Sequence, residues 1–439
     1  MANPILPLWE YIPDGEPRVF GDRVYLYGSH DRVGSEDFCD FKLKVWSAPI
    51  NDLQNWVCHG ESFHTKTDAD HASDVDWSER ELYAPDVIEK DGKYYLYAYI
   101  LNSKGCVGVS DKPEGPFKLL SRYEYSPDDA GDEGIYNDSG VFVDDDGKVY
   151  IYYGFERSHM NEIDPESMYK IKSGSLVQDL IPNGKDDSDF FEASSMRKIG
   201  DTYYFIYSGK RGSRLYYATS KSPTGPFEKR GYIIDNGKDY PAGNNHGSIC
   251  KINDQWYIFY HRMTNGTIMS RRACAERIEI LPDGSIPEVE MTSLGFENAL
   301  DPYKITPAEI ACYLTGGCMV TEKNSFCRPI AEITSGSVIG YKYFDFGDDF
   351  SSKTMELCVL VAGGGCKSEI HVIADDPESG EELGVVDICL GDGEYTARIK
   401  SLTGRHAIFF KITHSYNGWL KSAFDNRRLF ELLSFVFKK

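Results

Sequence analysis

Five hairpin-like segments recur along the first three hundred residues, and they constrain the fold more than any other feature of the chain. Each combines an apolar strand, a short polar turn and a second strand rich in aromatic residues. Their turns begin at Gly21, Asp91, Asp146, Gly200 and Asn253, with successive offsets of 70, 55, 54 and 53 residues. A repeat of about fifty residues is typical of a β-propeller blade.

A second motif follows some of these hairpins at a constant place. The segments "SDKPEGPFKLL" from Ser110 and "SKSPTGPFEKRG" from Ser220 follow the second and fourth hairpins, and "SAPINDLQNW" from Ser47 follows the first. Each unit is therefore predicted to hold about four strands. We predict an all-β fold in which a five-bladed β-propeller fills residues from about 5 to 295. A stack of separate sandwiches would not explain five evenly phased hairpins.

The net charge and the cysteine content limit which binding partners and which cellular location are expected for the protein. The net charge of −22 argues against binding to nucleic acid or to an anionic membrane. The N-terminal residues lack a basic region and a long apolar run, so we expect neither a signal peptide nor a membrane segment. Eleven cysteines occur without a CxxC pair or a histidine-rich spacing. We therefore expect neither a zinc site nor a disulfide framework, but reduced thiols and a cytoplasmic location. The sequence does not indicate an oligomeric state.

Most of the repeats carry an ionisable side chain at the same position relative to the turn. Four of the five units carry such a residue seven or eight positions before the turn: Asp14, Asp138, Glu192 and His246. The second unit has Tyr83 or Ala84 there, and we interpret the nearby Asp86 as structural. Because the innermost strand of each blade lines the central channel, these groups are expected to meet at one mouth of it. Three carboxylates brought together should have separated pKa values.

Carboxylates on opposite walls of a pocket are the machinery of glycoside hydrolysis. One must be protonated to donate to the leaving oxygen, and the other must be ionised to activate water or to attack directly. A third carboxylate can raise the pKa of the acid by repulsion. Asp144, Asp145 and Asp146 form a tight run in a turn and are interpreted as solvated.

The repeats also resemble glycoside hydrolase family 43, whose members are five-bladed propellers that invert at the anomeric carbon. The resemblance is carried by "IPDGEPRVFGDRVYLYGSHD", "LYAPDVIEKDGKYYLYAY", "YNDSGVFVDDDGKVYIYYG", "FFEASSMRKIGDTYYFIYS" and "NNHGSICKINDQWYIFYHR". It implies that Asp14 is the general base, Glu192 the general acid and Asp138 the carboxylate that tunes the pKa of the acid. The family's base is usually followed by proline, whereas Gly15 stands here, so Glu16 is an alternative base.

The same resemblance implies the surroundings of the carboxylates. His246 is similar to the axial histidine of the family, which in relatives often faces a water-coordinated calcium ion or a water cluster, and no other cofactor is implied. Arg271 is similar to an arginine that contacts the site carboxylates, with Arg272 as the alternative. Further candidates for binding the sugar are Trp9, Tyr11, His30, Asp31, Trp77 and Tyr83.

From about Lys304 onward the sequence pattern changes to short segments of alternating apolar and polar residues, separated by glycine-rich turns. This pattern predicts an antiparallel β-sandwich. We therefore expect a propeller over residues 1–303 and a sandwich over residues 304–439. The segment resembles a family 6 carbohydrate-binding module, but Trp419 is its one tryptophan, and Tyr395 stands where a tryptophan is common. Packing against the propeller and binding of sugar are both open interpretations.

The favoured function is an inverting exo-glycosidase that removes α-L-arabinofuranosyl or β-D-xylosyl residues from short plant cell-wall oligosaccharides of the arabinoxylan or arabinan type. One alternative is an endo-arabinanase or a β-galactofuranosidase on the same scaffold, which depends on loops such as residues 68–80. Another is a propeller that binds sugar without catalysis.

Overall fold

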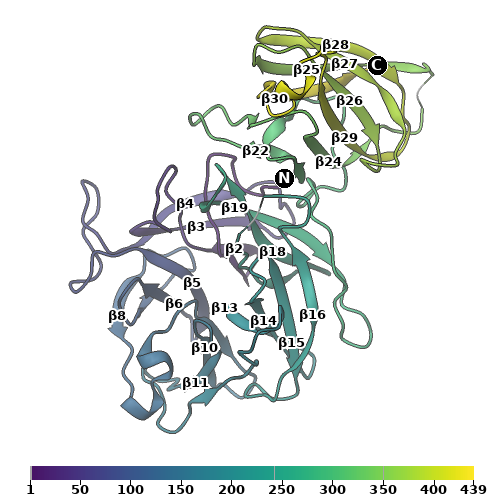
Figure 1. The fold of residues 1–439 in the computed structure, drawn as a ribbon. Helices are drawn as coiled ribbons and strands as arrows, with labels where there is room; N and C mark the ends of the chain where they lie inside the picture. Colours follow the sequence, from purple (N-terminus) through teal and green to yellow (C-terminus); the bar gives the residue numbers. More distant parts are fainter. Residues whose placement is uncertain (1, 242, 350) are drawn as a thin grey trace.

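The computed structural model describes residues 2–241, 243–349 and 351–439. Five antiparallel sheets follow one another along residues 16–278, and each begins with one of the five hairpins (Figure 1). The predicted five-bladed β-propeller is confirmed, and a β-sandwich follows it. No helix in the described parts of the chain is long and apolar enough to cross a membrane.

The blades follow the chain in order. Blade 1 holds β1 (Glu16–Phe20), β2 (Arg23–Tyr27), β3 (Lys42–Pro49) and β4 (Val57–His64). Blade 2 holds β5 (Leu82–Lys90), β6 (Lys93–Ile100), β7 (Cys106–Ser110) and β8 (Lys118–Arg122). Blade 3 holds β9 (Gly140–Val143), β10 (Val149–Tyr153), β11 (His159–Ile163) and β12 (Val177–Gln178). Blade 4 holds β13 (Phe190–Ile199), β14 (Thr202–Gly209), β15 (Arg214–Ser220) and β16 (Glu228–Asp235). Blade 5 holds β17 (Ile249–Ile252), β18 (Gln255–Thr264) and β19 (Thr267–Ile278).

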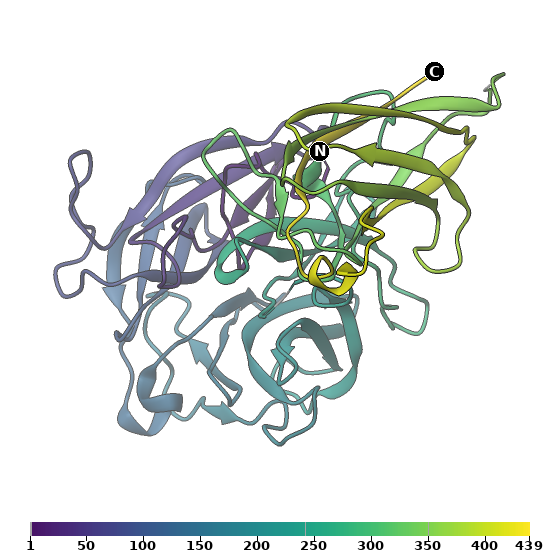
Figure 2. The ribbon, with the colours of Figure 1, turned by 45° about the horizontal axis from the view of Figure 1, so that its top comes forward.

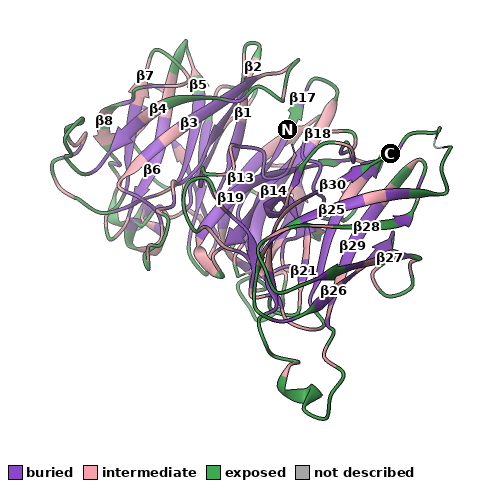
Figure 3. Ribbon diagram, turned by 90° about the horizontal axis from the view of Figure 1, so that it is seen from above, coloured by how far each residue is buried: buried purple, intermediate pink, exposed green. Residues whose placement is uncertain are grey.

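The first strand of each blade is the innermost one, and these strands contact one another around the central channel. Their approach is close at Gly140, where a Cβ atom would lie 2.4 Å from the carbonyl oxygen of Ser194. Only glycine fits this contact between blades 3 and 4. Figure 3 shows that buried residues run along the strands while the connecting loops are exposed.

The fifth blade differs from the expected four strands, because its sheet has three in the described chain. The N-terminal segment takes the fourth place. The amide of Ile5 donates to the carbonyl of Ala273 at 2.9 Å. The buried side chain of Asn3 donates to the carbonyl of Ala275 and accepts from its amide, both at 2.9 Å. The two ends of the propeller are therefore joined by hydrogen bonds to β19.

The C-terminal domain is built from two antiparallel sheets. One contains β20 (Thr306–Pro307), β22 (Met319–Val320), β23 (Ile330–Ala331), β25 (Thr354–Gly363), β28 (Gly393–Lys400) and β30 (Phe430–Lys438). The other contains β21 (Tyr313–Thr315), β24 (Val338–Asp345), β26 (Ser368–Ala374), β27 (Glu382–Ile388) and β29 (Arg405–His414). Short 3-10 turns occur at η1 (Pro127–Asp129), η2 (Gly131–Gly134), η3 (Ala308–Ile310) and η4 (Lys421–Ala423).

The sandwich packs against the propeller. One continuous apolar cluster includes Tyr260 of blade 5 and Tyr341, Phe410 and Phe435 of the sandwich. The sandwich lies beside the N-terminus and β19 in both ribbon views (Figures 1 and 2). Packing of this module on the propeller, one of the two open interpretations, is therefore present in the structure. Each of the eleven cysteines is free.

Candidate active site

One side chain from every blade lines a single cavity of about 230 Å³ at the propeller axis. These residues are Asp14, Tyr83, Asp138, Glu192 and His246. They are the residues that stand seven or eight positions before the five turns. Residues at equivalent positions in the five repeats therefore meet in one cavity.

The backbone bends sharply where these side chains enter the cavity. Asp14 (φ 58°), Ala84 (φ 27°), Asp138 (φ 47°) and Ala193 (φ 66°) all adopt left-handed conformations. Such conformations are unfavourable for residues with a Cβ atom and cluster at functional sites. The pairing register shifts at the same places in blades 2 and 4. A repeated kink therefore turns the start of four inner strands toward the channel mouth.

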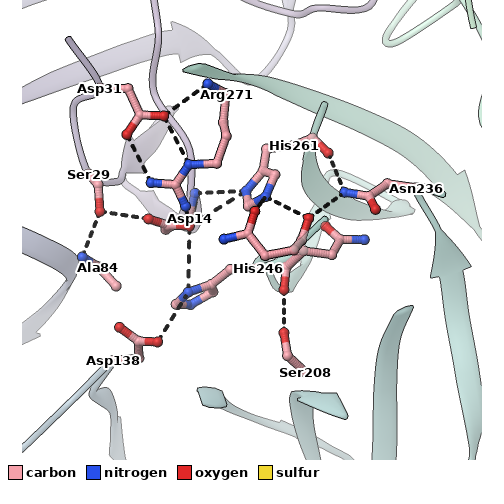
Figure 4. Close-up of polar contacts among 12 residues, drawn as sticks. Asp14, Ser29, Asp31, Ala84, Asp138, Ser208, Asn236, His246, His261 and Arg271 are labelled. Carbon is pink, nitrogen blue, oxygen red and sulfur yellow. Dashed lines mark hydrogen bonds and ion pairs between the residues drawn. The ribbon is translucent and has the colours of Figure 1, made fainter. Parts of the chain in front are cut away.

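Asp14 is buried and held by two donors. Arg271 donates from Nη1 to its Oδ1 at 2.8 Å, and Ser29 donates from Oγ to its Oδ2 at 2.7 Å (Figure 4). Burial alone would raise the pKa of Asp14, but the charge of Arg271 and the hydrogen bond from Ser29 help to bring it below 3.8, the ordinary value for aspartate. Asp14 is thus ionised at neutral pH and keeps a fixed orientation.

Arg271 is itself fixed by Asp31. The Nε and Nη2 atoms of Arg271 donate to the two carboxylate oxygens of Asp31, each at 2.9 Å. This two-point contact aims the remaining Nη1 at Asp14. Asp31, a candidate for binding a sugar hydroxyl, is buried, pairs with Arg271 and does not line the cavity.

A second histidine, His261, contacts the backbone of Asp14. The backbone amide of Asp14 lies 3.4 Å from Nδ1 of His261, whose Nε2 lies 3.1 Å from the carbonyl of Asn244. Burial and the charge of Arg271 lower the pKa of His261 to about 3. A neutral His261 can therefore donate to Asn244 and accept from the amide of Asp14. The repeat phase gave no signal for His261, which lies on the second strand of blade 5.

His246 lies between two carboxylates. Its Nδ1 is 3.8 Å from Oδ1 of Asp14 and 3.8 Å from Oδ2 of Asp138 (Figure 4). Burial raises the pKa of Asp138 to about 7, with His246 opposing and the charge of Glu192 adding to the shift. Burial and the charge of Asp14 raise the pKa of Glu192 to about 7 as well. The expected separation of pKa values is present: Asp14 is acidic, whereas the other two carboxyls hold protons more strongly.

Four aromatic side chains complete the wall of the cavity: Phe38, Tyr83, Tyr99 and Phe155. Tyr83 was expected here, and its ring meets that of Tyr99 edge-on at 5.9 Å. Tyr99 and Phe155 lie at or just past the ends of second strands, which return to the same mouth because the hairpins are antiparallel. This pairing could have indicated them. Phe38 lies in a loop and carries no such signal.

Two candidate sugar platforms lie elsewhere. Trp9 packs its ring 6.0 Å from that of Trp46 and is half exposed, outside the cavity. Tyr11 is buried, and its hydroxyl donates to Oε2 of Glu322 in the sandwich at 2.6 Å. Neither side chain lines the cavity, and Tyr11 connects the two domains.

Two further candidates are also occupied by other partners. The ring nitrogens of His30 lie 3.0 Å from Asp40 and 3.2 Å from Glu10. Trp77 donates from Nε1 to Ser103, and the guanidinium of Arg122 covers its ring at 3.8 Å. Neither side chain lines the cavity.

Glu16, the alternative base, and Arg272, the alternative arginine, form ion pairs away from the cavity. Glu16 forms a buried ion pair with Arg197 and accepts from Ser195 at 3.2 Å. Burial raises the pKa of Glu16, but Arg197 and Arg18 lower it by more. Arg272 contacts Glu309 at 3.5 Å beside the sandwich. Neither side chain lines the cavity, which leaves Asp14 and Arg271 in those places.

Asp86 has the structural place proposed for it. It binds Arg18 through two hydrogen bonds of 3.0 and 2.6 Å, and it accepts from the amide of Val141 at 2.7 Å. Arg18 also reaches the carbonyl of Val141 at 2.9 Å. These contacts tie blades 1, 2 and 3 together inside the channel.

Replacing Asp86 with asparagine should therefore destabilise the protein by about 3–5 kcal/mol, since a buried guanidinium loses the closer of its two charged partners, Asp86 at 2.6 Å and Glu16 at 3.5 Å. The free energy of unfolding in urea measures this. Asp91→Asn, in the exposed turn of the same hairpin, is the matched control and should change stability by less than about 0.5 kcal/mol. Equal stabilities of the two variants would contradict the structural role of Asp86.

Comparisons with known proteins agree with this architecture. The model of the family described as "Glycosyl hydrolases family 43" matches residues 1–286. A xylosidase/arabinosidase from Thermoclostridium stercorarium is 37% identical over 476 aligned positions, which cover 96% of this chain and 98% of that protein. A β-xylosidase/α-arabinofuranosidase from a compost microbial metagenome, solved with xylotriose in a calcium-free form, is 28% identical with a TM-score of 0.55 and covers 66% of this chain and 97% of that one. An arabinoxylan arabinofuranohydrolase from Bacillus subtilis, solved with cellotetraose, has a similar fold over 100% of this chain and 97% of that one, with 24% identity and a TM-score of 0.53.

Proposed function

This chain belongs to glycosyl hydrolase family 43, and from that premise we propose that it removes terminal β-D-xylosyl and α-L-arabinofuranosyl residues from plant cell-wall oligosaccharides. The observation that carries the proposal is the pairing of an acidic carboxyl, Asp14, with two carboxyls of raised pKa in one cavity. The names of the relatives that combine xylosidase and arabinosidase activity support the choice of sugars.

In the proposed mechanism Asp14 accepts a proton from the attacking water. Its ionised form and its two fixed donors suit this role. Glu192 donates a proton to the leaving oxygen, for which its raised pKa is favourable. Asp138 faces His246, and the charge of Glu192 raises the pKa of Asp138. Because repulsion between two carboxylates is mutual, the proposed role of Asp138 is to raise the pKa of the acid when Asp138 is ionised. Water attacks the face opposite the leaving group, so the anomeric configuration inverts.

The size of the cavity supports cleavage at the chain end. At about 230 Å³ it is smaller than the 300–1,000 Å³ typical of sites for drug-sized ligands. One pentose ring would fill it, and the aromatic wall offers apolar faces to that ring. The eleven free thiols support a reducing compartment for this work, where short oligosaccharides would be the substrates.

The side chains around His246 offer few free oxygen ligands of their own to a calcium ion, so an ion there would be held mainly through water. Calcium takes six to eight oxygen ligands, whereas His246 faces Asp14 and Asp138, and Asp14 is already bound by Arg271. On the inner strands β1 and β13, Arg18 and Arg197 supply positive charge. The proposed acid–base steps use protein side chains alone.

Hydrolysis of 4-nitrophenyl β-D-xyloside, α-L-arabinofuranoside and β-D-galactofuranoside tests the proposal. We expect turnover of the first two, and proton NMR of the first sugar released should show the inverted anomer. Turnover of the galactofuranoside alone, or of internal arabinan linkages alone, would replace the proposed substrate. Sugar binding without turnover of any substrate would favour the non-catalytic alternative.

The pH dependence of kcat should be bell-shaped. Glu192 acts when protonated, so activity should fall as pH rises through an apparent pKa of about 7 that belongs to the Glu192–Asp138 pair. Asp14 acts when ionised, so activity should fall only below the ordinary aspartate value of 3.8. In Asp138→Asn the loss of a like charge should move the alkaline limb to lower pH. An unmoved limb in this variant would contradict the role given to Asp138.

A further inference from the structure

A second cluster of ligating side chains lies outside the catalytic cavity, at the end of blade 1. We propose that Glu61, His64, Asp68 and His71 form a binding site for a divalent transition metal such as Zn²⁺. The potential ligand atoms of these four residues all lie within 4.8 Å of one another. Two of them come from β4 and two from the loop that follows it.

The spacing of the donor atoms suits a small ion. Nδ1 of His71 is 2.9 Å from Oε2 of Glu61, and Nε2 of His64 is 3.3 Å from the same oxygen. Nδ1 of His71 is 4.0 Å from Oδ1 of Asp68. Metal–ligand bonds of about 2.0–2.1 Å in a tetrahedron require donors roughly 3.3 Å apart. Small side-chain adjustments would therefore complete the coordination.

His64 points to a ligand independently of this spacing. Its side chain is only 5% exposed, and Nε2 makes no hydrogen bond. A buried ring nitrogen without a hydrogen-bond partner is unfavourable unless something else binds it. His64 lines a cavity of about 260 Å³ together with Glu61 and His71.

The neighbouring groups hold the ligands in place. Asp68 accepts hydrogen bonds from the amides of Asp70 and His71 through Oδ1, at 2.9 and 2.8 Å. Lys42 binds Oε1 of Glu61, which leaves Oε2 facing the histidines. The rings of His64 and His71 are stacked with centroids 4.5 Å apart. The loop is thus already folded around the cluster.

The types of ligand in the cluster indicate which metal ions it would bind. Two imidazole nitrogens and two carboxylates match zinc, cobalt and nickel, whereas Ca²⁺ and Mg²⁺ prefer oxygen ligands alone. A bound ion would connect the end of β4 to residues 68–71. It would therefore stabilise the connection between blades 1 and 2 without taking part in the acid–base chemistry.

Titration of the metal-free full-length protein with ZnCl₂ in a calorimeter tests the site. We expect one ion per chain, a higher thermal unfolding midpoint with zinc, and no comparable response to CaCl₂. Co²⁺ should give the visible absorption bands of a tetrahedral complex, which report on this geometry and not on activity. His71→Gln and Asp68→Asn alter exposed ligands and should weaken zinc binding by about 100-fold or more.

Two matched substitutions separate this site from general binding of zinc to surface groups. Asp70→Asn removes a carboxylate from the same loop, and His406→Gln removes an exposed histidine that pairs with Asp375. Both should bind zinc as the parent does. Absence of one-to-one binding, or equal affinity of His71→Gln and His406→Gln, would overturn the proposal. Because the catalytic residues are unchanged in all four variants, failure of the zinc site is distinguishable from failure of the proposed function.

Discussion

Replacing Asp14 with asparagine should lower kcat by about 10³-fold or more, toward the upper end of the effect of a general base. The amide cannot accept a proton from water, yet its oxygen can still accept from Arg271 or Ser29, so the cavity should keep its shape. Initial rates on the best aryl glycoside measure the loss. Circular dichroism and the unfolding midpoint check that the variant is folded.

A small anion offers a sharper test of the same residue. In Asp14→Gly, azide could take the place of water and attack without a base, giving a glycosyl azide of inverted configuration. Rate recovery with azide is expected in this variant and not in the parent. Asp145→Asn, in an exposed turn, is the control and should keep parental activity. A parental rate for Asp14→Asn would show that another group activates water.

Replacing Glu192 with glutamine should reduce hydrolysis of xylobiose or arabinobiose by about 10³-fold, because an alcohol leaves poorly without a proton. A 2,4-dinitrophenyl glycoside has a leaving group that needs no proton, so its rate should fall by less than about tenfold. The ratio of the two effects distinguishes an acid from a residue that merely shapes the cavity.

The same variant should also lose the alkaline limb near pH 7, since that limb reports the deprotonation of Glu192. Glu228→Gln, on an outer strand and 78% exposed, should leave rates and pH profile unchanged. Equal losses on activated and unactivated substrates would contradict the role of Glu192 as the proton donor.

The repeats made the fold and the centre of the site predictable, because equal phase in equal blades means equal position around an axis. That argument found Asp14, Tyr83, Asp138, Glu192 and His246. Candidates chosen for being close in sequence to these residues do not line the cavity. Neighbours along an extended chain point in different directions, so Trp9, Tyr11, His30 and Trp77 face other partners.

What the sequence did not reveal depends on contacts between distant segments. Asp31 supports Arg271 from 240 residues away, and neither motif indicates that pairing. His261 and Tyr99 lie on second strands, where the phase used for the first strands does not apply. The proposed metal cluster was not predicted, because the fold is needed to bring Glu61 and His64 of β4 next to Asp68 and His71.

The hydrogen bonds between Asn3 and Ala275 have a consequence for how the enzyme folds during its synthesis. They join residues 272 positions apart, and a contact of such long sequence separation is slow to form because a large loop must close. On the ribosome residue 3 emerges long before residue 275, so the circle of blades stays open until the last blade has been made. The cavity takes a side chain from all five blades. Partial chains are thus without a working centre, and hydrolysis begins only when the circle closes.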